Sequence, residues 1–444
     1  MVLADKNSTV PGKSRSWFWR LALLFSAIYF FSQNGLGALP NLPLQFLLKN
    51  TLKLDPSQLA YFQAVTLIAW VIKPLWGFIS DSFPLFGTRR KSYLMLSSLL
   101  AAASWLALAW AHENYWMVLI VISVCYLAYA FQDVVTDGLM IETGKPYDLT
   151  GKFQAIQWSA VYAAMVIAAF CGGAIADLIQ HGKLSYRVVF AGTALFPAMT
   201  AALVFFCAPK EVPRVTSEAG SELKDLFRHK SIWILALFLF FWNFSPSFGA
   251  PFFYYSVDTL KFSGIFLGAL QGAASAAGLL GSILYGKYIE RISMRRFLIF
   301  AVFFGIGAIL FNYIFFIPFV IQNGMLLKGL ALGSNFIFGM LGTWIFLTLL
   351  NLAAKVSPQF AGGTAFALLM SFYNLGLMGS SALGGLVFPV TGLKPLILIS
   401  ALFSLFVLFF MPFLPIPEPL TGLESRIQAF LQKIASFSRK VRLK

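Results

Sequence analysis

Three ionisable side chains lie inside long apolar stretches of this sequence, where charge is costly and usually functional. Lys73 lies in the apolar run that starts near Leu59, and Asp133 and Asp137 lie in the stretch AYAFQDVVTDGLMIE. The two aspartates are four residues apart, so on a helix they share one face. If both stretches cross a membrane in the same direction, Lys73 and Asp133 lie at similar depth and can pair. Such a pair can contact an anionic or polar solute or titrate during its transport; a static ion pair between helices is the alternative.

A basic turn follows the stretch that contains Lys73, in the sequence WVIKPLWGFISDSFPLFGTRRKSY. Gly77 and Asp81 are four residues apart, and Gly87, Arg89 and Arg90 come just before another apolar run. A charged turn between two apolar segments is typical of the short loop that joins two membrane helices. A loop that only sets membrane orientation would not need the aspartate and the glycine at these spacings. We call residues 77–91 the first basic turn.

Neutral amide side chains near the middle of apolar stretches are the next candidates for contacting a solute. An amide in a membrane helix either serves that purpose or forms an interhelical hydrogen bond, which is worth roughly 0.6 kcal/mol. Aromatic side chains beside such amides can stack on a flat heterocycle. The candidate amides are Gln33, Asn34, Gln157, Asn243, Gln271, Asn335 and Asn374.

The composition is that of a polytopic membrane protein. Of the 444 residues, 59% are hydrophobic and 11% are charged, against roughly 25% charged in soluble domains. Basic residues that collect in cytoplasmic loops account for the net charge of +16, so we expect no nucleic-acid partner. The 3 cysteines and 3 histidines form neither a disulfide framework nor a metal-binding or catalytic cluster. We therefore predict a protein that is not an enzyme and that needs no metal and no cofactor.

Twelve apolar segments are long enough to cross the hydrocarbon core of a bilayer, which takes about 20 helical residues. We predict an all-α membrane protein with two six-helix halves, at 17–208 and 231–414, separated by a cytoplasmic loop at 209–230. An N-terminal tail at 1–16 and a basic amphipathic tail at 415–444 complete the chain. The predicted spans are residues 17–49, 57–80, 92–111, 115–140, 152–177, 186–208, 231–257, 263–289, 297–320, 325–353, 360–388 and 393–414.

The distribution of basic residues predicts the orientation in the membrane. Most of the 33 lysines and arginines fall in the two tails and in the loops after even-numbered spans. By the positive-inside rule these segments are cytoplasmic, which places both termini and the first basic turn inside the cell. The polar tail at 1–16 has the features of neither a signal peptide nor an organellar transit region. We therefore predict a multi-pass protein of a bacterial inner (plasma) membrane.

The second half contains a degenerate copy of the first basic turn, in the sequence GSILYGKYIERISMRR. Gly281 and Gly286 are followed by Arg291, Arg295 and Arg296 at the end of the predicted eighth span. We call residues 281–296 the second basic turn. Two six-span halves with matching basic turns favour an architecture with two pseudo-symmetric repeats.

The first basic turn resembles the glycine–aspartate–glycine–arginine loop between helices 2 and 3 of major facilitator superfamily transporters. Its longer form, with KPLWG, SDSFP and RRK, and the stretch QDVVTDGLMIE are similar to the folate–biopterin transporter family in particular. The resemblance implies the major facilitator fold and secondary transport of a small organic solute by alternating access. It further implies a folate or a pterin as the substrate and protons as the coupling ion. We expect the transporter to be a monomer.

The resemblance also implies roles for particular residues. In the superfamily this loop forms a charge network that locks the two halves in the outward-facing state, often together with an acid of the fourth span. The gating residues implied here are Gly77, Asp81, Gly87, Arg89, Arg90 and Asp137. Lys73, Asp133 and the seven amides then belong to the substrate-binding or coupling site.

Two alternatives stay open at this point. Carriers of muropeptides or of other anionic metabolites share the acids of the fourth span and the paired arginines. A receptor or a lipid scramblase built on the same fold would not transport a solute at all. Uptake measured with folate, pterin and muropeptide competitors distinguishes these possibilities.

Overall fold

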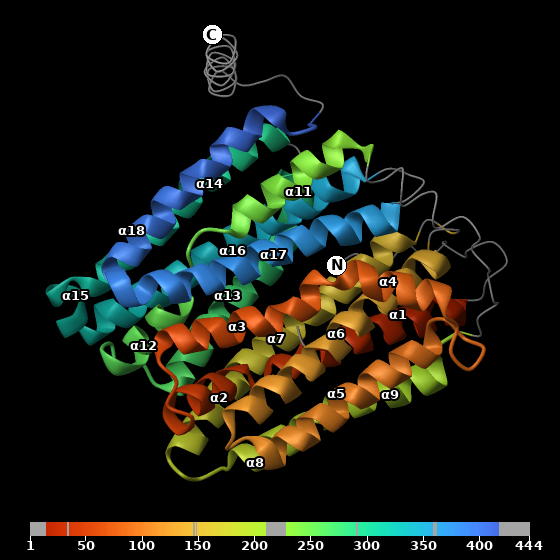
Figure 1. The fold of residues 1–444 in the computed structure, drawn as a ribbon, viewed down its shortest axis with the longest axis horizontal. Coiled ribbons are helices and arrows are strands. Elements are labelled where there is room, and N and C mark those ends of the chain that lie inside the picture. Colours follow the sequence, from red (N-terminus) through yellow and green to blue (C-terminus); the bar gives the residue numbers. More distant parts are fainter. Residues whose placement is uncertain are drawn as a thin grey trace, which may run out of the picture. The chain divides into compact units, whose positions relative to one another are not determined.

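The computed structural model describes residues 15–32, 35–144, 147, 149–209, 228–289, 292–357 and 362–416, and almost all of them are helical (Figure 1). Within these residues, 11 helices are long and apolar enough to cross a membrane, and the apolar helix Lys230–Asn243 is shorter. The predicted tail at 1–16, the central loop at 209–230 and the amphipathic tail at 415–444 lie almost entirely outside the described residues.

The chain forms two compact units. The first takes the described residues within Met1–Asp55, Ile72–Ser217 and Lys261–Leu279. Its helices are α1 (Arg15–Phe31), η1 (Leu36–Ala38), α2 (Asn41–Phe46), η2 (Leu47–Thr51), α4 (Lys73–Ser82), α5 (Lys91–Ala111), α6 (Tyr115–Gly144), α7 (Thr150–Gln180), α8 (Tyr186–Thr193), α9 (Leu195–Cys207) and the first part of α13 (Gly264–Leu284).

The second unit takes the described residues within Pro56–Val71, Glu218–Leu260 and Leu280–Lys444. Its helices are α3 (Pro56–Val71), α11 (Lys230–Asn243), α12 (Gly249–Asp258), the end of α13, η4 (Tyr285–Ile289), α14 (Met294–Phe311), η5 (Asn312–Phe316), α15 (Pro318–Gln322), α16 (Gly324–Val356), α17 (Gly362–Thr391), α18 (Leu393–Ser404) and η7 (Leu405–Phe413). The second and eighth spans are thus each divided between the units. The predicted halves at 17–208 and 231–414 stay a prediction.

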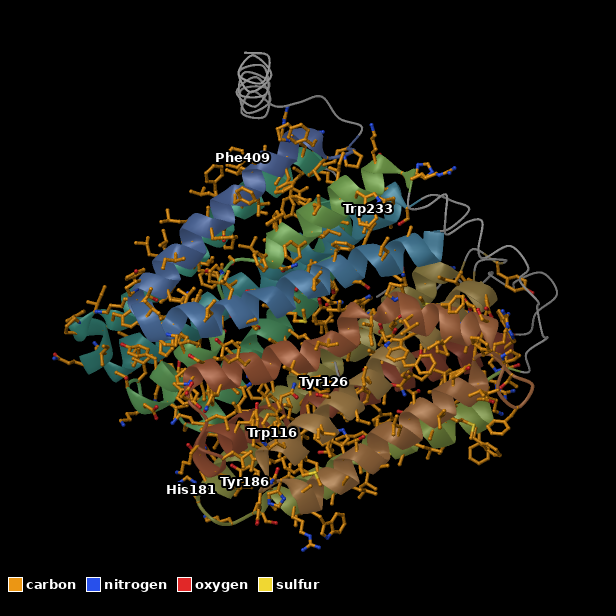
Figure 2. All side chains as sticks on the ribbon, viewed as in Figure 1. Trp116, Tyr126, His181, Tyr186, Trp233 and Phe409 are labelled. Carbon is orange, nitrogen blue, oxygen red and sulfur yellow. The ribbon has the colours of Figure 1, made fainter. Side chains whose placement is uncertain are left out.

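Each unit has its own apolar core. In the first unit, Phe25 of α1 and Phe153 of α7 are fully buried. In the second, Phe238 of α11 and Leu369 of α17 are fully buried. Large apolar side chains also point away from the cores, such as Trp116, which is 66% exposed (Figure 2). Exposed apolar and aromatic side chains of this kind are suited to contact lipid.

The second span, predicted as one helix at 57–80, is broken at Ile72. α3 ends just before this residue, which has φ −88° and ψ 17°, and α4 begins at Lys73. Pro74 explains the break, because its nitrogen carries no hydrogen for the carbonyl of Trp70 four residues earlier. The side chain of Asn374 donates to that carbonyl instead, over 3.3 Å. The break makes Lys73 the first residue of a helix.

The seventh span, predicted as one helix at 231–257, consists of the two shorter helices α11 and α12. Pro246 lies in the break between them, where a helix cannot continue. The hydroxyl of Ser380 in α17 donates to the carbonyl of Ser245, and the carbonyl of Ser380 accepts from the nitrogen of Ser247 over 2.9 Å. These bonds satisfy backbone groups that neither lipid nor a regular helix would satisfy.

Glycines and a capping carboxylate hold the first part of α13 against α7 in the first unit. A Cβ on Gly268 of α13 would lie 2.8 Å from the Cα of Gly173 in α7, so the two backbones are in contact there. The Asp177 carboxylate accepts hydrogen bonds from the first two backbone nitrogens of α13, over 2.6 and 3.0 Å. A carboxylate at a helix N-terminus is favourable, since it satisfies free N–H groups and meets the positive end of the helix dipole.

Candidate functional site

Lys73 forms an ion pair with Asp133 inside the first unit. The ammonium of Lys73 at the start of α4 lies 2.6 Å from Oδ2 of Asp133 in α6. Both side chains are mostly buried, with exposed fractions of 15% and 16%. A cation in the first turn of a helix opposes the helix dipole, so the neighbouring carboxylate is needed to hold the charge there. The structure therefore brings together the two residues whose pairing we expected from their depth.

Tyr29 of α1 connects this ion pair to the second aspartate. Its hydroxyl oxygen lies 2.9 Å from Oδ1 of Asp133 and 3.0 Å from Oδ1 of Asp137. Tyr29 is buried in the core formed by α1, α6 and α7. Sequence reasoning missed Tyr29, because a tyrosine within an apolar run has the same pattern as any core aromatic residue.

Gln157 of α7 completes the polar cluster, which we define as Tyr29, Lys73, Asp133, Asp137 and Gln157. The Gln157 side chain lies beside the Asp137 carboxylate and is almost fully buried. Within the described part of the chain its Oε1 atom has no hydrogen-bond partner. A buried acceptor without a donor costs roughly 1–3 kcal/mol. This oxygen is therefore suited to accept from a ligand or a water molecule.

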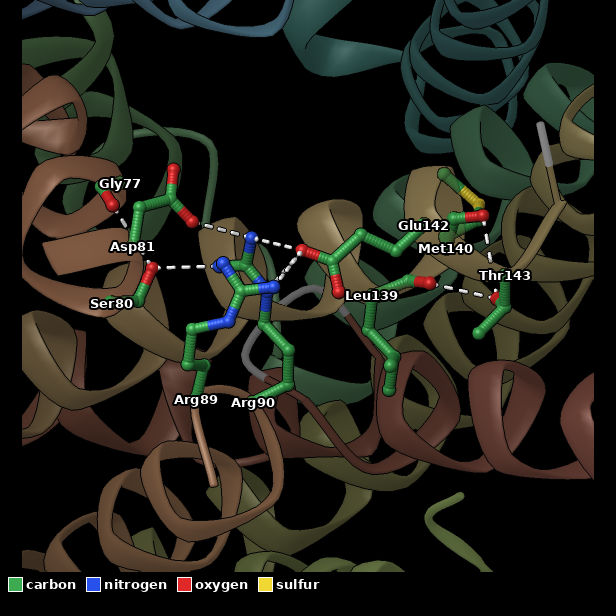
Figure 3. Close-up of polar contacts among 9 residues, drawn as sticks. All are labelled: Gly77, Ser80, Asp81, Arg89, Arg90, Leu139, Met140, Glu142 and Thr143. Atoms are coloured by element: carbon green, nitrogen blue, oxygen red, sulfur yellow. Dashed lines mark hydrogen bonds and ion pairs between the residues drawn. The ribbon is translucent and has the colours of Figure 1, made fainter. Parts of the chain in front are cut away.

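A second charged group surrounds Arg90, which lies directly before α5 (Figure 3). Its Nη2 atom is 2.5 Å from Oδ1 of Asp81 in α4 and 2.8 Å from Oε1 of Glu142 in α6. Its Nη1 atom donates to the Ser80 hydroxyl over 2.8 Å, and Arg89 reaches the same Glu142 oxygen at 3.5 Å. We call these five residues the arginine cluster. It joins the end of α4, the start of α5 and the end of α6.

The two acids that flank Arg90 differ from the arginine in exposure. The Arg90 side chain is 6% exposed, whereas those of Asp81 and Glu142 are 47% and 34% exposed. Burial lowers the pKa of Arg90, and the Glu142 and Asp81 carboxylates raise it by more, so the net shift of its pKa is upward. Arg90 therefore keeps its positive charge.

The structure places Asp137 differently from the expected gating network. The acid of α6 that meets Arg90 is Glu142, five residues beyond Asp137 and thus roughly 140° further around the helix. Asp137 lies instead with Asp133 and Tyr29 in the polar cluster. Sequence reasoning missed Glu142, because a glutamate near a span end has the appearance of an ordinary solvated residue.

The first basic turn reverses the chain through a tight hairpin. Leu85 and Thr88 exchange two backbone hydrogen bonds, of 3.0 and 2.9 Å. Phe86 and Gly87 between them have φ values of 49° and 75°, the pattern of a type I′ turn. Space around Gly87 is open, so the backbone conformation is what requires a glycine there.

Gly138 of α6 lets the Arg90 side chain approach the helix. A Cβ at this position would lie 2.7 Å from Cζ and 2.9 Å from Nη2 of Arg90. The predicted gating residue Gly77 has more room, because a Cβ there would meet only Cγ1 of Val134, at 3.7 Å. Gly138 is thus a further residue that sequence reasoning did not identify.

Four of the remaining candidate amides lie in the described part of the chain. Asn243 donates to the carbonyls of Leu239 and Tyr373, and Asn335 donates to the carbonyl of Ala331 in its own helix. As described above, the Asn374 amide donates to the backbone at the break in the second span. These three belong to the second unit, and the side chain of Gln271, on α13 of the first, is exposed. Gln33 and Asn34 lie outside the described residues.

Solved structures of transporters share this fold. A D-xylose–proton symporter superposes with a TM-score of 0.68 at 17% identity, over 91% of this chain and 99% of that one. A single-residue mutant of the nucleoside transporter NupG superposes with a TM-score of 0.67 at 17% identity, over 89% of this chain and 100% of that one. The predicted major facilitator fold is thereby confirmed.

The family follows from the sequence relatives. Residues 34–429 match the BT1 family. A "Folate-biopterin transporter" of Synechocystis sp. is 32% identical, over 93% of this chain and 85% of its own. A "Folate transporter 2" of Plasmodium falciparum is 25% identical, over 88% of each chain. The chain belongs to the BT1 family, and it is a multi-pass secondary transporter of a small molecule rather than an enzyme.

Proposed function

We propose that this transporter carries a folate or a pterin and that the polar cluster of the first unit contacts it. The observation that carries this proposal is the Lys73–Asp133 ion pair, held within the membrane spans and joined by Tyr29 to Asp137. Burying an ion pair within membrane spans is costly, and ionisable residues found there usually serve transport. The names of the relatives in two distant organisms support the choice of substrate.

The chemistry of the cluster suits this class of substrate. A pterin ring presents an exocyclic amine and a ring N–H as donors, and the glutamate of a folate presents carboxylates. Carboxylate oxygens of Asp133 or Asp137 and the buried Oε1 of Gln157 accept from such donors, and the ammonium of Lys73 pairs with a carboxylate. The cluster therefore offers complementary groups either to the pterin ring or to the glutamate of a folate.

We further propose proton-driven transport by a monomer in a bacterial inner membrane, with both termini in the cytoplasm. The net charge of the cluster supports proton coupling: two aspartates face one lysine, so one added proton neutralises it. The bias of basic residues supports the orientation.

Uptake into proteoliposomes tests the substrate. The purified protein should accumulate radiolabelled folate or biopterin, and both unlabelled compounds should compete. Competition by muropeptides alone would identify the alternative carrier class. An absence of uptake for every compound, with the protein folded and inserted, would favour a receptor or a scramblase and refute the proposal.

Variants of the ion pair separate function from structure. We expect Lys73→Ala and Asp133→Ala each to lower both surface expression and uptake, because each leaves a charge without its partner. The double variant should express well and still not transport. Full uptake by the double variant would reduce the pair to a static tie between α4 and α6.

Cysteine labelling tests the orientation. In a background without Cys125, Cys171 and Cys207, a cysteine at position 86, where the native side chain is 95% exposed, should react only from the cytoplasmic side. A cysteine at position 183, in the exposed turn after α7, should react from outside. External labelling at position 86 would overturn the orientation.

A further inference from the structure

We infer that Asp137 holds the transported proton and that Tyr29 transmits its presence to the Lys73–Asp133 ion pair, an inference that rests on the proposed proton-driven transport. The site lies wholly within the first unit and draws on helices α1, α4, α6 and α7.

The Tyr29 hydroxyl has more partners than one hydrogen can serve. Its oxygen is within hydrogen-bond distance of a carboxylate oxygen of Asp133 and of one of Asp137, at 2.9 and 3.0 Å. A phenol donates only one hydrogen, and an ionised carboxylate donates none. If both acids were ionised, one of the two contacts would join two acceptors, which repel each other. The geometry therefore favours a second hydrogen, carried by one of the two acids.

The acid that carries it is Asp137. Asp133 is held in its ionised form by the Lys73 ammonium, 2.6 Å from its other oxygen. Within the described residues no lysine, arginine or histidine lies within ion-pair distance of Asp137. The hydrogen bonds then run in one direction: Asp137 donates to the Tyr29 oxygen, Tyr29 donates to Asp133, and Lys73 donates to the far oxygen of Asp133.

The groups that face Asp137 are few, and all belong to the polar cluster. They are Tyr29 from α1, Lys73 from α4, Asp133 from α6 itself and the neutral Gln157 from α7. With Asp137 protonated, the charges of this cluster sum to zero. Without the proton they sum to one negative charge in a mostly buried place, which is unfavourable.

Loss of the proton changes the contacts of the ion pair. The Asp137 O–H bond breaks, its electron pair stays on the carboxylate and the proton passes to water. The single hydrogen of Tyr29 then serves only one of the two acids, and the other contact becomes repulsive. Lys73 is drawn from Asp133 towards the new charge. Lys73 is the first residue of α4, directly after the break in the second span. Movement of Lys73 on loss of the proton therefore acts on the break between α3 and α4.

Infrared difference spectroscopy tests the proton without any substrate. The wild-type protein should show the C=O stretch of a protonated carboxyl group, which disappears when the pH is raised. Asp137→Asn should abolish this band, and Tyr29→Phe should shift it, since the acid loses its acceptor. A band that is unchanged in Asp137→Asn would place the proton elsewhere and overturn the inference.

Transport assays test the coupling. In proteoliposomes, Asp137→Asn should fail to accumulate substrate in response to a proton gradient, and any exchange of internal for external substrate that it retains should no longer vary with pH. The asparagine mimics the protonated acid, because its amide still donates to Tyr29. Tyr29→Phe should show a displaced pH profile of accumulation. Accumulation by Asp137→Asn, or an unchanged pH profile in Tyr29→Phe, would overturn the inference.

Tyr129→Phe is the matched control. Tyr129 is another buried tyrosine, on α6, and its hydroxyl accepts from the indole nitrogen of Trp105 over 3.1 Å rather than meeting the aspartates. This variant should keep the infrared band and the pH profile. If it loses either, the effects of Tyr29→Phe are due to packing and the inference is overturned. Because the infrared band is independent of substrate, a wild-type protein that shows it but moves no folate refutes only the proposed function.

Discussion

The two basic turns share one kind of hydrogen bond between helices and differ in a second contact. In each, a basic residue at the start of the next helix donates a hydrogen bond to a backbone carbonyl near the end of another helix of the same unit. Lys91 of α5 donates to the carbonyl of Phe205 in α9 over 2.8 Å. Arg295 of α14 donates to the carbonyl of Met411 in η7 over 3.0 Å, and to those of Leu414 and Ile416 over 3.4 and 3.3 Å.

The difference lies four residues after the leading glycine of each turn. Asp81 occupies this place after Gly77 and pairs with Arg90. Tyr285 occupies it after Gly281, and its hydroxyl accepts from Thr348 of α16 over 3.3 Å. The first turn thus connects its helices through charges, and the second connects α16 to the end of the eighth span through neutral hydroxyl groups.

The bonds to backbone carbonyls occur at both turns, whereas the arginine cluster is an additional feature of the first. A hydrogen bond of this kind that recurs at both turns is suited to holding each unit together. The arginine cluster occurs at the first turn, and its two acids are partly exposed. Water can therefore take the place of Arg90 at these carboxylates when the cluster opens. We therefore interpret it as a contact that breaks and re-forms during transport, in keeping with the gating role that the sequence implies.

Arg90→Ala should affect uptake, whereas Arg295→Ala should affect stability. These two effects are the largest that we expect. Arg90→Ala should lower initial uptake about tenfold, which corresponds to ~1.4 kcal/mol in the balance between transport states. Its melting temperature should change little, because Asp81 and Glu142 are partly exposed and become hydrated. Arg295→Ala should lower the melting temperature, since each buried carbonyl left without a donor costs roughly 1–3 kcal/mol.

Uptake per folded molecule and thermal unfolding in detergent measure the two effects. Arg296→Ala is the control for loss of a basic residue, because this arginine is exposed beside Arg295. It should leave both quantities near the wild-type values. If Arg90→Ala loses stability and keeps its uptake, the arginine cluster is a structural tie like the second turn.

Substitution of two glycines of the first unit tests the arginine cluster further, with a smaller expected effect on uptake. Gly138→Ala should displace the Arg90 guanidinium, because the added Cβ would lie 2.7 Å from Cζ. We expect uptake to fall part of the way towards that of Arg90→Ala. Gly77→Ala should be tolerated, since its Cβ would be 3.7 Å from the nearest atom and alanine favours a helix by about 1 kcal/mol. Equal uptake by both variants would show that the close approach of Arg90 to α6 does not matter.

The span-level fold and the positions of the main charges followed from the sequence. The lengths of the apolar segments predicted the spans, and the direction of successive spans predicted that Lys73 and Asp133 lie at one depth. Pro74 and Pro246 are visible helix breakers, yet continuous hydropathy concealed the breaks that they cause in the second and seventh spans. Hydropathy averages over the segment, whereas a missing N–H acts at one position.

The partners of the charges were harder to predict. Tyr29 and Gly138 act through contacts between helices, and nothing in their own sequence windows distinguishes them from core or packing residues. Asp137 and Glu142 are both acids near the end of α6. Which of them meets Arg90 depends on how far the helix has rotated by the level of the turn, and that rotation is set by packing against α4, α5 and α7 rather than by spacing alone.

The smallest expected effect concerns the tip of the first basic turn. Phe86 has φ 49° and a side chain that is 95% exposed. A left-handed conformation costs an L-residue other than glycine or asparagine roughly 1–2 kcal/mol. Phe86→Asn gives the Asn–Gly pair that type I′ turns favour. It should therefore raise stability by up to ~1 kcal/mol, seen as a higher melting temperature, with uptake unchanged. Phe83→Asn is the control, because Phe83 is also exposed, at 58%, but has φ −121° and gains nothing from asparagine. A lower melting temperature for Phe86→Asn would show that the exposed ring has a stabilising contact that outweighs its backbone strain.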